Sequence, residues 1–126
     1  MRRSEQRRAA VFALYQHDLT KRPLDDVFER EALPFTRALA HATADYTEEL
    51  DAHIQRHAKN WSLDRIAPLE RNIMRVALYE LLHRPDVPAE VAIDEAVETA
   101  KELCSADAPK FVNGILGAVE REEVAS

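Results

Sequence analysis

Glycine is nearly absent from this 126-residue chain, in which only Gly114 and Gly117 occur. Glycine supplies most of the positive-φ backbone that hairpin turns and phosphate-binding loops require, so both kinds of structure are disfavoured. Nowhere do apolar and polar residues alternate strictly over a strand's length between turn residues, so we predict no strands. The chain is therefore expected to fold from helices.

Apolar residues recur at steps of three and four along most of the chain, which is the spacing of one helical face. The predicted helical segments are 4–20, a short piece at 24–28, a long helix from Pro34 through Ile54, a turn at 63–66 capped by Ser62, then 68–83, 91–104 and a last helix opened by Asp107 and Pro109. We predict an all-α fold, a compact bundle of six or seven helices, in one domain spanning residues 1–126.

Composition narrows the class of protein further. Hydrophobic residues make up 46% of the chain, which is too many for a disordered chain. Cys104 is the only cysteine, so no internal disulfide or cysteine-based zinc site can form, and its place on an apolar helical face predicts a buried thiol. No apolar run approaches the ~20 residues that span a bilayer, and we expect a cytoplasmic protein without a membrane partner.

The net charge of −6 argues against a polyanionic partner, but the charges are unevenly distributed. Arg2, Arg3, Arg7 and Arg8 lie within seven residues, opposed only by Glu5. Arg7 falls on the apolar face of the first predicted helix, where burying an unpaired guanidinium is costly, so we expect the start of that helix to extend beyond the core. Composition alone gives equal weight to a nucleic-acid contact and to a solvated tail.

Motifs for catalysis are missing. The chain has no nucleophile elbow and no glycine-rich nucleotide loop, so we predict that it is not an enzyme and needs no cofactor. Glu49, His53 and His57 share one helical ridge and offer metal-ligand chemistry, but the pattern favours a solvated polar edge, and we predict no metal site.

The segment Asp107–Gly114 combines a charge and a ring near a helix start. Lys110 and the helix amino terminus suit an anion, and Phe111 offers a face on which a base can stack, although the pattern alone favours Phe111 as core. Gly114 inside a helix costs ~1 kcal/mol relative to alanine, which indicates that a neighbouring helix or a ligand approaches the backbone there.

Three blocks of the sequence form distinctive motifs: RRAAVFALYQHD from Arg7, WSLDRIAPLERNIMRVALYELLHRPDVPAEVAIDEAVETAKEL from Trp61, and KFVNGILG from Lys110. Through these blocks the sequence resembles, over nearly its whole length, the NusB family of transcription-antitermination factors. The segment 21–60 carries little family signature. The chain departs from the family pattern at Cys104-Ser105, where an aromatic residue followed by glycine is frequent, and at Gly117.

The resemblance implies an all-α fold and binding of boxA, a short single-stranded element of nascent RNA, together with the ribosomal protein NusE. This pair would promote read-through by RNA polymerase, notably of ribosomal RNA operons, with other Nus factors and the polymerase as indirect partners. The implied RNA contacts are Arg2, Arg3, Arg7, Arg8, Tyr15, Asp107, Lys110 and Phe111. Asp107 is expected to cap a helix and to accept hydrogen bonds from a base, and Glu70 matches a position facing the ribosomal protein.

Two other functions stay open at the level of sequence. NusB-like modules also occur at the start of some ribosomal RNA cytosine methyltransferases, and a helical bundle of this kind can serve protein interactions alone. The sequence leaves open whether the chain is a monomer or a homodimer.

Overall fold

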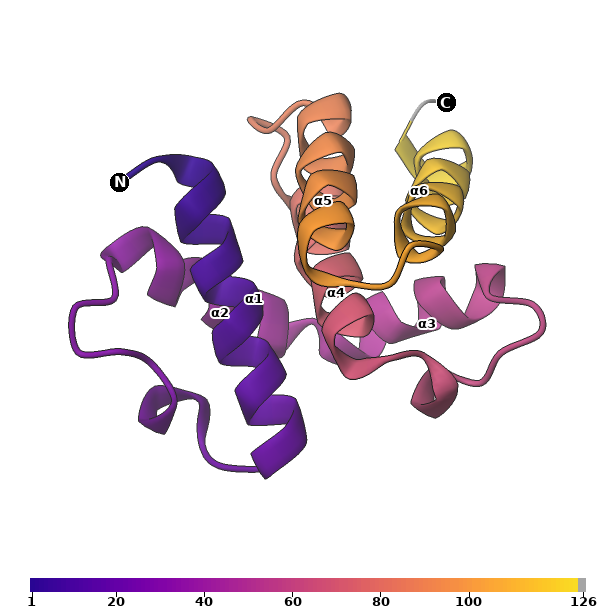
Figure 1. The fold of residues 1–126 in the computed structure, drawn as a ribbon. Coiled ribbons are helices and arrows are strands. Elements are labelled where there is room, and N and C mark those ends of the chain that lie inside the picture. Colours follow the sequence, from indigo (N-terminus) through magenta and orange to yellow (C-terminus); the bar gives the residue numbers. More distant parts are fainter. Residues whose placement is uncertain (125–126) are drawn as a thin grey trace.

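The computed structural model describes residues 1–124, and every regular element in that range is a helix (Figure 1). This confirms the predicted all-α bundle. The six α-helices are α1 Arg3–Thr20, α2 Pro34–Asp45, α3 Thr47–His57, α4 Pro68–His83, α5 Ala89–Leu103 and α6 Ala108–Val119. Two 3₁₀ turns, Leu24–Asp26 and Leu63–Arg65, and a π turn, Glu120–Val124, complete the described chain.

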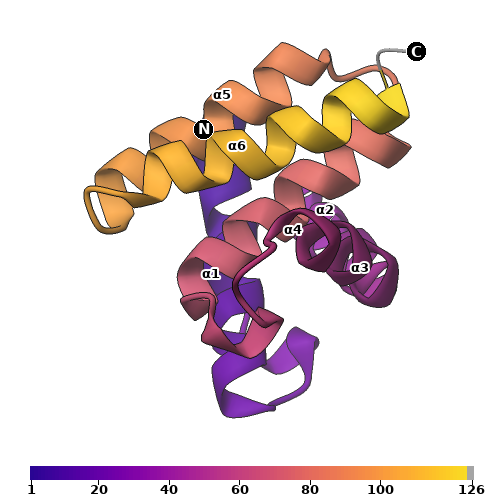
Figure 2. The same ribbon diagram turned by 90° about the vertical axis from the view of Figure 1, so that its right-hand side faces the viewer.

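Helix α4 lies at the centre of the bundle and packs against each of the other five α-helices. Its inward face carries the fully buried Ile73, Met74 and Leu78. Helices α5 and α6 run side by side over one flank of α4 (Figure 2), whereas α1 and α2 pack together on another. The long middle block of the sequence therefore builds the element on which all the others assemble.

The long helix predicted from Pro34 through Ile54 is divided at Tyr46, so that prediction was wrong. Tyr46 leaves helical geometry (φ −104°, ψ 11°), and its N–H bonds to Thr43 three residues back, at 3.1 Å. The hydroxyl of Thr47 donates to the Ala44 carbonyl at 2.8 Å, which offers the backbone an alternative to the helical ladder. Apolar spacing continues across the break because both halves face the core, so periodicity could not reveal it.

Three smaller details also differ from expectation. The segment at 24–28 forms only a 3₁₀ turn, and Ser62 makes no side-chain cap bond to the turn that follows it. Cys104 ends α5 in extended backbone and is only partly buried. Burial, and then the charge of Glu70, raise the pKa of the Cys104 thiol.

A network of ion pairs and hydrogen bonds joins α1, α3 and α4. Asp18 accepts hydrogen bonds from Arg71 Nη2 at 2.9 Å, Asn72 Nδ2 at 3.0 Å and Arg75 Nη1 at 3.1 Å. Arg75 also forms a two-bond pair with Asp51, at 2.7 and 2.8 Å. Because each largely buried charge has an opposite partner, the desolvation cost of this network is offset.

Between residues 1 and 124 no helix has both the length and the low polarity needed to cross a bilayer.

Candidate nucleic-acid interface

The arginine-rich start of the chain forms the first turns of α1, and two of its arginines remain at the surface. The Arg2 side chain is 83% exposed and reaches Glu5 only at 3.5 Å. The Arg3 guanidinium lies 3.9 Å from the centroid of the Phe35 ring, and its Nη1 donates to Gln6 at 3.2 Å. Weak surface contacts of this kind leave both cations available to an incoming anion.

Arg7 occupies a different environment. Its Nε–H is shared between the two carboxylate oxygens of Glu80 on α4, at 2.9 and 3.1 Å. The Arg7 side chain is 13% exposed and that of Glu80 only 1%. The expectation that the helix start extends beyond the core was therefore wrong at Arg7, because α4 supplies a buried counter-charge that the local pattern could not reveal.

Arg8 connects α1 to α5. Its Nη1 lies 2.6 Å from Glu102 Oε2, near the carboxyl end of α5. Arg8 Nε is buried and has no hydrogen-bond partner within the described chain, so one donor of this guanidinium is unsatisfied. The pair brings the arginine-rich start close to the end of α5, five residues before Asp107.

Tyr15 lies seven residues after Arg8, and two helical turns place the two side chains on one stripe of α1, about 10 Å apart along the axis. Its side chain is half-buried. The stripe therefore presents a cation and a partly exposed ring in line.

The start of α6 carries the second group of candidates. Asp107 is exposed and occupies the N-cap position with helical backbone (φ −85°, ψ −15°), and its carboxylate makes no cap hydrogen bond. The predicted cap was wrong because a side-chain cap needs extended backbone at that position. Lys110 is exposed and makes no ion pair with residues 1–124. Both charges are free to meet a ligand.

Phe111 is half-buried, packs against the core with one part and lines a cavity of about 310 Å³ with another. Trp61, Glu70 and Asp107 line the same cavity. Phe111 can therefore pack against the core and still present part of its ring to a ligand. The cavity joins Asp107 and Phe111, the predicted RNA contacts, to Glu70, the predicted contact of the ribosomal protein.

Glu70 is partly buried on the first turn of α4, and this burial raises the pKa of its carboxyl group. In the free chain the ionised form of Glu70 is therefore less stable than the ionised form of an exposed glutamate.

Trp61 and Arg65 also line the cavity, but the sequence marked Trp61 only as a break between helices and did not single out Arg65. Trp61 is 52% exposed. A tryptophan in a loop next to a helix-breaking segment was the signal that could have found it.

The helical ridge of Glu49, His53 and His57 does not converge on one point. Glu49 Oε2 lies 2.8 Å from His83 Nε2 on α4, whereas His57 Nε2 lies 3.2 Å from Glu122 Oε2 after α6. Across residues 1–124 no group of three or more metal-binding side chains is assembled.

Gly114 faces open space on the exposed side of α6, and a Cβ atom built there meets no atom of the described chain within 4 Å. The first explanation offered for this glycine, a closely packed neighbouring helix, is therefore excluded within residues 1–124. The second explanation, a ligand that approaches this backbone, stays a prediction.

Sequence and structure both match known proteins. Residues 4–121 match the NusB family. The chain is 38% identical to the transcription antitermination protein NusB of an Exiguobacterium species, over 98% of this chain and 100% of that protein. NusB from T. maritima superposes with a TM-score of 0.88 at 34% identity, covering 97% of this chain and 92% of that one. A structure of the antitermination factors NusB and NusE in complex with dsRNA matches with a TM-score of 0.82 at 26% identity, covering 96% and 98%.

Proposed function

The chain belongs to the NusB family, and from that premise we propose that it is a transcription antitermination factor that binds the single-stranded boxA element of nascent RNA together with the ribosomal protein NusE. In this role it promotes read-through by RNA polymerase, notably of ribosomal RNA operons, with other Nus factors and the polymerase as indirect partners.

The observation that carries the proposal is the Arg8–Glu102 pair, which holds the arginine-rich start of α1 near the end of α5 and hence near the start of α6. On a chain of net charge −6, the exposed cations Arg2 and Arg3 precede Arg8 on α1, and the exposed Lys110 follows Glu102 by eight residues, in the first turn of α6. Local charge of this kind attracts phosphates even when the whole protein is acidic.

Each side chain of this face has a role that suits an unpaired strand. Arg2, Arg3, Arg8 and Lys110 contact phosphates, and Tyr15 and Phe111 stack on bases. The free carboxylate of Asp107 accepts a hydrogen bond from a base amino or imino group. Arg7, whose charge is neutralised by Glu80, supports the face mainly by fixing α1 to α4.

Glu70 contacts the ribosomal protein. The cavity that it shares with Asp107 and Phe111 supports this role, because RNA and NusE would then meet along one continuous surface. We propose further that the chain works as a single helical RNA-binding domain over residues 1–126, without catalytic activity, in the cytoplasm.

Fluorescence anisotropy with a labelled boxA oligoribonucleotide tests the proposal. The full chain with NusE is titrated against boxA, a scrambled strand and a boxA duplex at several salt concentrations. We expect the single strand of boxA to bind best, with each phosphate contact contributing roughly 0.7 to the slope of log K against log salt. Equal binding of all three RNAs, or no binding with NusE present, would contradict it.

A further inference from the structure

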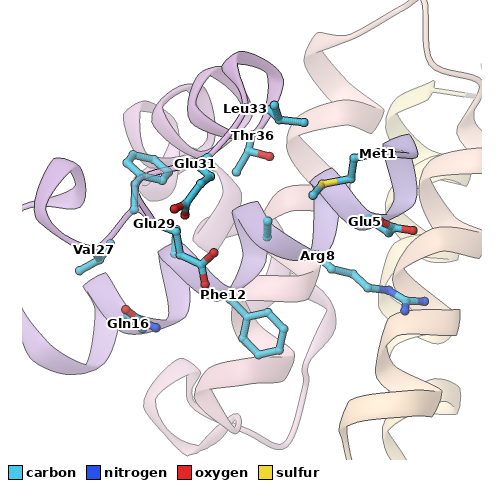
Figure 3. A pocket seen from close by; sticks show the side chains of 14 residues that line it. Met1, Glu5, Arg8, Phe12, Gln16, Val27, Glu29, Glu31, Leu33 and Thr36 are labelled. Atoms are coloured by element: carbon cyan, nitrogen blue, oxygen red, sulfur yellow. The ribbon is translucent and has the colours of Figure 1, made fainter.

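A second concave surface lies beside the proposed RNA face, between α1 and the segment 27–33 that leads into α2 (Figure 3). We call it the α1 groove. It has a volume of about 450 Å³, and Ala9 and Ala13 from α1 and Val27 and Leu33 from the opposite side line it. Phe12, 41% exposed, stands at its edge. An apolar concavity with a large exposed ring is typical of a surface that receives another molecule.

The charges around the α1 groove are mostly negative. Glu5, Glu29 and Glu31 line it, and neither Glu29 nor Glu31 forms an ion pair with residues 1–124. Met1, which carries the amino-terminal charge, and Arg8 are the lining residues with a positive charge, and the Arg8 guanidinium reaches away toward α5 and pairs with Glu102 (Figure 3). The α1 groove is therefore apolar inside, and Glu29 and Glu31 at its edge have no ion-pair partner among residues 1–124.

We propose that the α1 groove is the docking site for a basic amphipathic segment of another protein, whose apolar side chains enter the groove beside Phe12 and whose lysines or arginines meet Glu29 and Glu31. The charge pattern selects this occupant, because opposite charges at the edge steer the encounter while apolar anchors hold the complex. An amphipathic helix laid into a groove is a recurring way to combine the two.

The same charges disfavour the other occupants. A polynucleotide is repelled by Glu29 and Glu31, and two copies of a chain of net charge −6 repel each other. The strongly basic stretch at residues 2–8 cannot supply the segment to a second copy, because it is folded into the start of α1, where Arg7 is held against the buried Glu80.

Docking in the α1 groove extends the proposed function. Residues 8 and 15 form one stripe of α1, and residues 9, 12, 13 and 16 form the neighbouring stripe that lines the groove. A protein seated there would lie alongside RNA bound at Arg8 and Tyr15, so the structure offers a site for a component beyond the RNA itself.

The test uses the full chain, isotope-labelled for NMR, with a synthetic lysine/leucine amphipathic peptide as the basic probe and its glutamate/leucine counterpart as the matched probe. We expect the basic peptide alone to bind, with amide shifts concentrated at Ala9, Ala13 and Val27. Phe12→Ser should weaken binding about tenfold or more. The double variant Glu29→Gln/Glu31→Gln should weaken it about threefold to tenfold.

The control is Glu90→Gln/Glu98→Gln, which removes the same charge from exposed positions of α5 and should leave peptide affinity unchanged. The proposal is overturned if this control weakens binding as much as the groove variants, or if the shifts appear elsewhere on the surface. It is equally overturned if boxA RNA produces the same shifts in the groove, or if sedimentation shows a dimer that Phe12→Ser dissociates.

Discussion

Arg7 and Glu80 form an ion pair between α1 and α4, with the carboxylate almost completely removed from solvent. The pair lies directly beneath the arginine-rich surface, so the element that carries the proposed RNA contacts is attached to the central helix by a buried charge. Desolvating two charges costs about as much as their attraction returns, but removing one alone leaves the other without compensation. The pair therefore fixes the geometry of α1 more than it adds to overall stability.

We predict that Arg7→Met lowers the free energy of unfolding by about 3 kcal/mol or more, because it leaves Glu80 buried and unpaired. The double variant Arg7→Met/Glu80→Leu should recover most of that loss, since it removes both charges. Urea denaturation of the three proteins measures this. A single variant as stable as the parent chain would show that Glu80 finds another partner or solvent.

The helical class and most helix bounds could be predicted from periodicity, because each helix buries one face against the bundle. The features that could not be predicted depend on partners distant in sequence. Arg7 is buried because Glu80, seventy-three residues later, lies opposite it. The break at Tyr46 coincides with a hydrogen bond from the Thr47 hydroxyl to the Ala44 carbonyl, and it leaves the apolar spacing unchanged.

The candidate site could be predicted only in part, because it too depends on contacts between residues distant in sequence. The sequence identified the arginines and the Asp107–Gly114 segment separately, but only the fold shows that the Arg8–Glu102 pair connects them. Trp61 and Arg65 join the cavity beneath Phe111 because the 3₁₀ turn Leu63–Arg65 folds toward α6, and no local pattern encodes that approach.

Phe111→Ala should reduce boxA affinity by about 1–3 kcal/mol, the cost of losing one stacked base. It should also lower the melting temperature, because part of the ring packs on the core. Val112→Ala is the matched control, since Val112 is fully buried and should lose stability without losing RNA affinity. Thermal melts beside anisotropy titrations separate the two effects, and a Phe111→Ala protein with unchanged affinity would make this ring a core residue alone.

Gly114→Ala should stabilise the free chain by up to about 1 kcal/mol, because alanine is the better helix former and its Cβ meets no atom within 4 Å. The same change should weaken the complex with NusE and boxA if a partner approaches this backbone closely. At Gly117 a Cβ lies 3.3 Å from Arg121 Nη1, the far end of a flexible side chain that can move aside, so Gly117→Ala serves as the control for helix propensity on the same helix. If Gly114→Ala stabilised the chain and left assembly intact, the glycine would have no interface role.

Acid should destabilise the chain through Asp18. Burial alone would raise the pKa of Asp18, but hydrogen bonds from Arg71 and Asn72 and the charges of Arg71 and Arg75 outweigh it, so the pKa lies below its ordinary value of 3.8. The stabilisation is complete above pH 3.8 and is lost as the pH falls through the lower folded-state pKa. Asp18→Asn should cost about 1–3 kcal/mol at pH 7. Urea melts from pH 7 to pH 2 should give a flatter acid limb for this variant, and parallel curves would contradict the prediction.

Glu70 gives stability the opposite dependence on pH. Burial raises the pKa of Glu70 above its ordinary value of 4.5, so the folded chain favours the protonated form, and stability falls as the pH rises from 4.5 through the folded-state pKa. Glu70→Gln removes the charge and should make the free chain more stable at pH 7, while reducing affinity for NusE by about tenfold if the carboxylate meets a cation there. Glu98→Gln, on the exposed surface of α5, should change neither property. Denaturation of the free chain and calorimetric titration with NusE measure the two effects. A variant that gained stability and kept full affinity would mean that the Glu70 carboxylate makes no contribution to binding NusE.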